Sequence, residues 1–173
     1  MKLPVILMML LALCVAAPAQ KTTTIKVYFG SEKFNPNTED CNKVYPVKRQ
    51  VAKTQATATA ALLELFKGTT KAEEADQYTS FSATEMAGIL KSIRVKSGAA
   101  YVNFTNRFTE QMGTASTSCG GSQFFSMVEK TLRQFPTIKK VYYAVEGNTN
   151  DFYEWAQVGE CPHGRHCSKK NFQ

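Results

Sequence analysis

The first regular hydrophobic pattern of the chain lies in residues 25–29, where apolar and polar side chains alternate strictly. Such alternation predicts a half-buried strand with its odd-numbered residues on the buried side. Residues 44–51 are also rich in β-branched side chains, but they include Pro46, which has no N–H to donate. We therefore predict an edge strand at most for residues 44–51.

The next pattern is helical. Between residues 56 and 67, apolar side chains such as Leu63 and Phe66 recur near helical spacing, and Gly68 stands where a C-terminal cap belongs. Residues 69–86 are polar, and we predict a loop with about one helical turn there.

Alternation returns in the second half of the chain. Ile93 and Val95 alternate with cations, and residues 101–104 alternate again after the turn at Ser97-Gly98. This pattern predicts a hairpin in which Ile93 and Val95 face the core.

A second helix and a last strand complete the pattern. An apolar stripe at positions i, i+4, i+8 and i+11 predicts a helix after residues 120–122, and Pro136 ends it. The stripe consists of Phe124, Val128, Leu132 and Phe135. Residues 139–146 then alternate as a strand, and residues 148–173 have no regular pattern.

The elements follow the order strand, helix, strand, strand, helix, strand. This order predicts an α+β fold of the split βαβ type, in which two helices cover one face of a mainly antiparallel sheet. We assign this domain to residues 20–147 and treat residues 148–173 as a basic C-terminal tail. The other face of the sheet is then left for solvent, a partner or a covering loop.

Length and composition agree with one globular domain. The chain has 173 residues, of which 43% are hydrophobic and 20% charged, which excludes a disordered tail or a collagen-like fibre. Its formal net charge of +7 favours an anionic partner over a cationic one.

Residues 1–19 have the features of a secretory signal peptide: a charged start, a short apolar run and a small-residue cleavage pattern that ends at Ala19. The run is shorter than the roughly 20 apolar residues that span a bilayer, so we expect a secreted or periplasmic protein without a transmembrane segment. The alternative is a lipoprotein anchored through Cys14. That motif requires a small residue before the cysteine, where this chain has the bulky Leu13.

Cleavage after Ala19 leaves four cysteines, which an oxidising compartment would join in two disulfides. Three pairings are possible. We favour Cys41 with Cys119 and Cys161 with Cys167, because the last two cysteines are near neighbours in the tail. The tail is then closed by a disulfide.

The same tail holds both histidines of the chain, His163 and His166, between Cys161 and Cys167. Two thiolates and two imidazoles would satisfy zinc, but these four residues lie closer together in sequence than zinc ligand pairs usually do. We therefore expect neither a metal ion nor another cofactor. A Ser or Cys nucleophile elsewhere lacks a histidine base nearby in sequence, so no catalytic residues are expected.

The candidate binding surface is the open face of the predicted sheet, which receives the residues that alternate with the inward ones. These residues are Lys26, Tyr28, Arg94, Lys96, Tyr101, Asn103, Lys140 and Tyr142. Phenol rings and cations together suit a sugar-rich or anionic polymer. The candidate ligand-binding residues are Tyr28, Arg94, Lys96, Tyr101 and Tyr142.

Two other interpretations of this face stay open. Basic grooves lined with aromatic rings also bind single-stranded nucleic acid, although we do not expect a nucleic acid as the partner. Strand faces also carry Lys, Arg and Tyr without any site, because these side chains pair across strands, and residues 35–51 could cover the face.

Five ordered segments carry a resemblance to a known family. They are VYF at 27–29, CNKVYPVKR at 41–49, LFKGTT at 65–70, VNF at 102–104 and TLRQFPTIKKV at 131–141. Together they resemble the GerMN domain, a family named for a bacterial spore-germination and sporulation protein. The chain departs from the family pattern at Thr69, where the resemblance leads us to expect proline, and in its basic tail.

The resemblance implies an extracytoplasmic bacterial module for binding or assembly, without catalytic residues. Our leading hypothesis is a non-catalytic secreted or periplasmic module that binds cell-envelope material, either peptidoglycan or another anionic polymer, or an envelope protein. One alternative is a self-assembling envelope protein whose homo-oligomer buries the open face. The other is an unrecognised secreted hydrolase that depends on His163 or His166.

Overall fold

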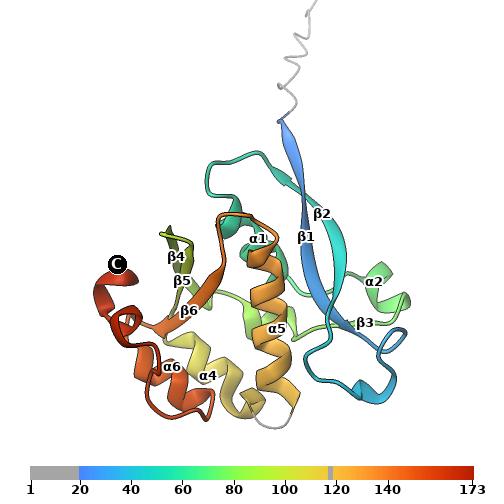
Figure 1. The fold of residues 1–173 in the computed structure, drawn as a ribbon. Coiled ribbons are helices and arrows are strands. Elements are labelled where there is room, and N and C mark those ends of the chain that lie inside the picture. The colour runs from blue at the N-terminus through green and yellow to red at the C-terminus, as the bar shows by residue number, and fades with distance from the viewer. Residues whose placement is uncertain (1–19, 117–118) are drawn as a thin grey trace, which may run out of the picture.

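A computed structural model describes residues 20–116 and 119–173 of the chain (Figure 1). The expected signal peptide, with Cys14 and the cut after Ala19, lies outside these residues. The strands are β1 (Thr22–Ser31), β2 (Tyr45–Ala52), β3 (Tyr78–Thr79), β4 (Leu90–Lys96), β5 (Ala99–Phe104) and β6 (Lys140–Val145). The α-helices are α1 (Thr57–Leu65), α2 (Lys71–Ala75), α3 (Ala83–Met86), α4 (Arg107–Met112), α5 (Cys119–Arg133) and α6 (Thr149–Trp155).

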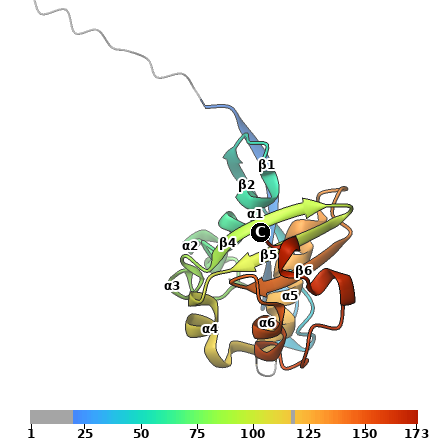
Figure 2. The same ribbon diagram turned by 90° about the vertical axis from the view of Figure 1, so that its left-hand side faces the viewer.

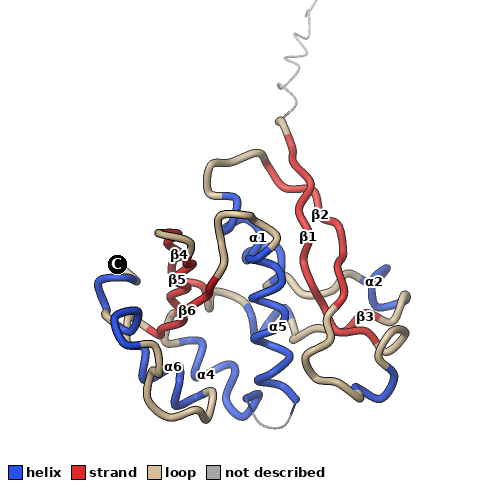
Figure 3. The backbone as a smooth tube through the Cα atoms, in the orientation of Figure 1, coloured by secondary structure: helices blue, strands red, loops and turns tan. Residues whose placement is uncertain are grey.

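The α+β class predicted from the sequence is confirmed, but the strands divide into two sheets. β1 lies between β2 and β3 in the first sheet, and β5 lies between β4 and β6 in the second. Among the strand pairs of the described residues, only β5 with β6 is parallel, and α4 and α5 form the crossover between those two strands. The helices α1 and α5 pack together between the sheets, so each sheet covers one side of this helix pair (Figures 1 and 3).

The alternation of β1 predicts its buried side correctly. Ile25, Val27 and Phe29 are at most 3% exposed, whereas Lys26 and Tyr28 between them are more accessible. The residues of the predicted second helix behave in the same way. Three of the four stripe residues, Phe124, Val128 and Leu132, lie on α5 and are fully buried, whereas Phe135 lies beyond the end of α5 and is half-buried.

Aromatic rings fill the centre of the core. Phe104 on β5 is fully buried, and its ring centroid lies 4.5 Å from that of Phe108, 5.7 Å from Phe152 and 5.8 Å from Phe124. These rings come from β5, α4, α5 and α6. The aromatic core therefore joins the last helix of the chain to the rest of the fold.

Residues 69–86 hold more structure than the predicted loop with one turn. Two short helices, α2 and α3, each begin with a capping box: Thr70 with Glu73, and Ser82 with Glu85. In each box the hydroxyl accepts the N–H of the glutamate, and the carboxylate accepts the N–H of the capping residue.

Both disulfides have the favoured pairing. Cys41, in the connection between β1 and β2, joins Cys119 at the start of α5, with the two Cα atoms 5.0 Å apart. Cys161 joins Cys167 within the C-terminal segment, with the Cα atoms 6.0 Å apart. The first disulfide ties two segments that are 78 residues apart in sequence.

The residues after Gly147 are an ordered part of the fold. The helix α6 packs against β6, and its residues Phe152 and Tyr153 belong to the hydrophobic core. Beyond α6, the chain crosses the outer face of β5 and β6 (Figure 2). Phe172 packs on this face and is only 1% exposed. Among the described helices, none has the length and hydrophobicity of a membrane span.

Candidate functional site

The structure divides the candidate binding face between the two sheets. Tyr28 lies on β1 of the first sheet, whereas Arg94, Lys96, Tyr101 and Tyr142 lie on β4, β5 and β6 of the second. Because the helix pair separates the sheets, these five residues do not share one surface.

The C-terminal segment covers Tyr101 and Tyr142, and each is only 5% exposed. The ring of His166 stacks on Tyr142 with centroids 4.2 Å apart, and the Tyr101 hydroxyl lies 2.8 Å from Nδ1 of His166. Phe172 meets the Tyr101 ring edge-on at 5.5 Å. A polymer therefore cannot stack on these two tyrosines in this arrangement, and the cover comes from the tail instead of residues 35–51.

The cations of β4 remain exposed, and one of them holds the tail in place. The Arg94 guanidinium donates hydrogen bonds to the main-chain oxygens of Lys170 and Gln173. Lys96 lies near the hairpin turn and is exposed. The contacts of Arg94 are thus with the chain itself, and Lys96 stays accessible.

The two histidines belong to this covering layer. Burial, together with the positive charges of Arg165 and Lys140, lowers the pKa of His166, which favours its neutral form. His163 packs edge-on against Tyr142, with centroids 5.1 Å apart. The neighbouring cysteines form a disulfide, so they offer zinc no thiolate, and the described residues contain no group of three or more potential metal ligands.

Val95 corrects the predicted hairpin. It was expected to face the core, but it is 45% exposed, and Ile93 is half-buried. The reason is that β4 is an edge strand and the nine-residue helix α1 does not extend over its end. Apolar surface is therefore accessible beside the N-terminal end of α1, where Ile93 and Val95 line a hollow.

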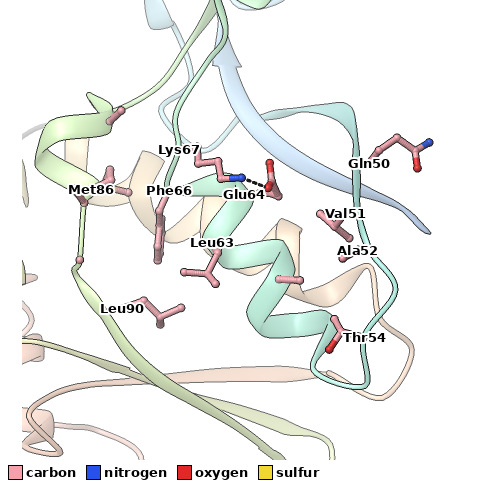
Figure 4. Close-up of a pocket in the computed structure, with 14 residues that line it drawn as sticks. Gln50, Val51, Ala52, Thr54, Leu63, Glu64, Phe66, Lys67, Met86 and Leu90 are labelled. Atoms are coloured by element: carbon pink, nitrogen blue, oxygen red, sulfur yellow. Dashed lines mark hydrogen bonds and ion pairs between the residues drawn. The ribbon is translucent and has the colours of Figure 1, made fainter. Parts of the chain in front are cut away.

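A separate groove of about 690 Å³ lies along the outer side of α1 (Figure 4). The end of β2 forms one wall, and α3 with the start of β4 forms the other. Leu63 projects from the floor towards Phe66 and Leu90, and it is 51% exposed. A mostly apolar groove that leaves such a side chain accessible is the natural candidate for a binding site.

An ion network at this groove, which includes the lining residue Glu64, holds β2 in place relative to α1 and α2. The Arg49 guanidinium donates to both carboxylate oxygens of Glu73, at 2.9 and 2.5 Å, and it lies 3.6 Å from the Glu64 carboxylate. The three side chains are only 12–16% exposed. This network was not predicted from the sequence, because Glu73 is 24 residues away from Arg49 and no local pattern links them.

The network predicts a pH-dependent contribution to stability. Burial raises the pKa of the Glu73 carboxyl, but hydrogen bonds from Arg49 and Thr70 and the Arg49 charge outweigh it, so the net pKa is lowered. A lowered folded-state pKa stabilises the fold above the unfolded pKa, and this contribution is lost as the pH falls through the folded pKa. We expect Glu73→Gln to cost about 1–2 kcal/mol at pH 7 and the difference from wild type to shrink below about pH 4.

Urea unfolding at pH 7 and pH 3 measures this difference. Glutamine keeps an oxygen for the N–H of Thr70, so the capping box survives the substitution. An equal loss of unfolding free energy at both pH values would contradict the assigned role of the Glu73 charge.

Comparisons with known proteins identify the family. The family model Germane, described as sporulation and spore germination, matches residues 26–151. The chain belongs to this GerMN family. The match includes the groove and both sheets and ends inside α6 of this GerMN domain. The family description names no chemical reaction.

Solved structures with similar folds include the tandem GerMN domains of the sporulation protein GerM from Bacillus subtilis. That structure is 18% identical with a TM-score of 0.50, and the match covers 87% of this chain and 48% of that one. This GerMN domain thus spans about half the length of the tandem chain. At such identity the likeness shows the fold alone.

Two further structures are also similar. The first GerMN domain of the same sporulation protein is 18% identical, with a TM-score of 0.47 and coverage of 86% of this chain and 98% of that one. A putative lipoprotein from Clostridium perfringens is 16% identical, with a TM-score of 0.41 and coverage of 76% and 80%. A comparison with curated proteins gave no match.

Proposed function

We propose that this GerMN domain is a non-catalytic extracytoplasmic module that binds another protein of the cell envelope through the groove over α1. The single observation that carries the proposal is the half-exposed Leu63 on the floor of an apolar groove. Burying such surface against an apolar partner is favourable, because it removes the surface from water.

The extracytoplasmic location rests on the disulfides and the leader pattern. Two disulfides among the described residues suit an oxidising compartment, since cytosolic thiols are kept reduced. Residues 1–19 have the composition of a signal peptide, which supports a secreted or periplasmic protein cut after Ala19.

A protein partner fits this surface better than peptidoglycan or another anionic polymer. The polymer hypothesis depended on tyrosines that share one open face, and Tyr101 and Tyr142 are covered while Tyr28 lies on the other sheet. The groove instead offers mainly apolar side chains, whereas a glycan presents hydroxyl groups that need hydrogen-bond partners.

The test places a photo-crosslinking amino acid at position 63 of the protein in its own cells. We expect a discrete protein adduct, and no such adduct from the same amino acid at position 158. Val158 is a matched control, because it is apolar and 58% exposed but does not line the groove. Equal labelling at both positions, or labelling of glycan strands alone, would overturn the proposal.

A substitution then measures the strength of binding to the captured protein. Leu63→Glu should weaken it by at least about tenfold, because it places a charge in the apolar interface. Its effect on unfolding free energy should stay within about 1 kcal/mol, since the side chain is half-exposed. Light scattering of the purified protein distinguishes a foreign partner from a second copy of the chain.

A further inference from the structure

The outer edge of β2 has main-chain groups that point away from the sheet. Alternate residues of an antiparallel strand bond to the same neighbour. The Lys53 N–H donates to the Lys21 oxygen at 2.8 Å, so the main-chain N–H and C=O groups of the odd-numbered β2 residues point towards β1. The N–H and C=O groups of Lys48, Gln50 and Ala52 therefore point outwards.

Hydrogen bonds on the far side of β1 independently confirm which main-chain groups point outwards. The Lys26 N–H donates to the Gln134 side-chain oxygen at 2.8 Å, and the Gln134 amide donates back to the Lys26 oxygen at 2.7 Å. The Tyr28 N–H donates to the Thr131 hydroxyl. The main-chain N–H and C=O groups of the even-numbered β1 residues thus point away from β2, and Lys26 lies opposite Lys48.

The outward groups of β2 border the groove. Gln50 and Ala52 line it, and the Gln50 side chain points away from the groove (Figure 4). Its amide donates to the Thr24 hydroxyl at 2.8 Å. The main chain of Gln50 therefore forms this part of the wall. Within the described part of the chain, no main-chain hydrogen bond reaches the outward groups of Lys48, Gln50 or Ala52.

The surroundings of this edge are basic. Lys48 and Lys53 are exposed along the strand and just beyond it. The Lys67 side chain also lines the groove and is 64% exposed, but it forms an ion pair with Glu64. The acidic side chain of the groove, Glu64, already pairs with Arg49 and Lys67. Acidic groups on a partner would complement the cations that remain.

We propose that the partner binds by adding an extended segment to the edge of β2. The segment pairs with the outward N–H and C=O groups of Lys48, Gln50 and Ala52, and it places apolar side chains at alternate positions over Leu63. Acidic residues at its ends face the lysines. Strand addition of this kind gains affinity from main-chain hydrogen bonds and specificity from the pockets for alternate side chains.

Pro46 sets the length of the pairing. It is the next even-numbered residue towards the start of β2, and it has no N–H to offer. The docked stretch is therefore centred on Gln50 and is short. This inference rests on the proposed function, because it describes how a partner would occupy the same groove.

The test uses twelve-residue peptides selected from a random library on the folded protein and then synthesised. Gln50→Pro removes the central outward N–H, whereas Gln50→Val keeps that N–H and also loses the side-chain bond to Thr24. We expect the peptides to bind wild type and Gln50→Val alike and Gln50→Pro about tenfold more weakly. Of the two peptide sets N-methylated at alternate amides, the set whose N–H groups face β2 should lose binding to the wild-type protein, and the other set should keep it.

Hydrogen exchange gives a readout that needs no substitution. Bound peptide should slow exchange at the amides of Lys48, Gln50 and Ala52, and selected sequences should alternate apolar residues between acidic ones. Unchanged exchange at these amides, or full binding by both N-methylated peptide sets, would overturn strand addition.

The outcomes separate this inference from the proposed function. If Leu63→Glu abolishes peptide binding while Gln50→Pro leaves it intact, the groove is the site and strand addition is wrong. If neither substitution weakens binding, both proposals are wrong. A library that yields no binder, or only basic or helical peptides, also contradicts the inferred partner chemistry.

Discussion

Replacing Phe104 by alanine is expected to lower the free energy of unfolding by about 3–5 kcal/mol, the usual cost of removing a fully buried phenyl ring. Phe104 is 0% exposed and lies within 6 Å of the rings of Phe108, Phe124 and Phe152. Because these rings come from four elements, they cannot collapse into the cavity without moving a helix or β5.

Urea or thermal unfolding followed by circular dichroism measures the loss. The control is Val158→Ala, which removes an apolar side chain that is 58% exposed and should change stability by less than about 0.5 kcal/mol. Similar losses for the two variants would show that the aromatic rings do not form the stabilising centre of the fold.

The second large effect is expected when Cys41 and Cys119 are both replaced by serine. On the chain-entropy model, a crosslink across 78 residues stabilises the fold by about 4–5 kcal/mol. Replacing Cys161 and Cys167, which are only 6 residues apart, should cost about 2 kcal/mol on the same model.

Denaturant unfolding of the two double-serine variants tests this ranking. The prediction depends on loop length alone, so equal losses would contradict it. A larger loss for the C-terminal pair would instead show that the covering segment contributes more to stability than the connection between Cys41 and α5.

Local patterns predicted the elements whose environment is set by neighbours in sequence. The alternation of β1 gave its buried side, and Pro46 marked β2 as an edge strand. The capping boxes at Thr70 and Ser82 were also visible as the spacing of a hydroxyl and a glutamate, so α2 and α3 could have been predicted from them.

The residues whose burial was predicted wrongly are those whose burial depends on contacts between distant segments. Val95 alternates like a core residue, but its burial depends on whether a helix reaches it, and α1 is too short. Tyr101 and Tyr142 alternate like surface residues and are covered by the last twelve or so residues of the chain. The aromatic Phe172 in a basic tail was the one local sign of that cover.

The candidate site was missed for the same physical reason. Its floor, Leu63, looked like one more core residue of an amphipathic helix, and only the separation of the sheets leaves it accessible. Pro46 indicated that β2 is an edge strand. It did not indicate that β2 lies beside α1, because that position is fixed by ion pairs between Arg49 and glutamates far away in sequence.

The side chain of Gln134 limits how far the first sheet can extend. Its amide bonds to the Lys26 N–H and oxygen as a neighbouring strand would. This edge of β1 is therefore already paired within the chain. At this position, a second segment cannot pair with β1 on the side of the sheet opposite β2. Strand addition to the first sheet is thus confined to the edge of β2, because the opposite edge of β1 is closed at Lys26.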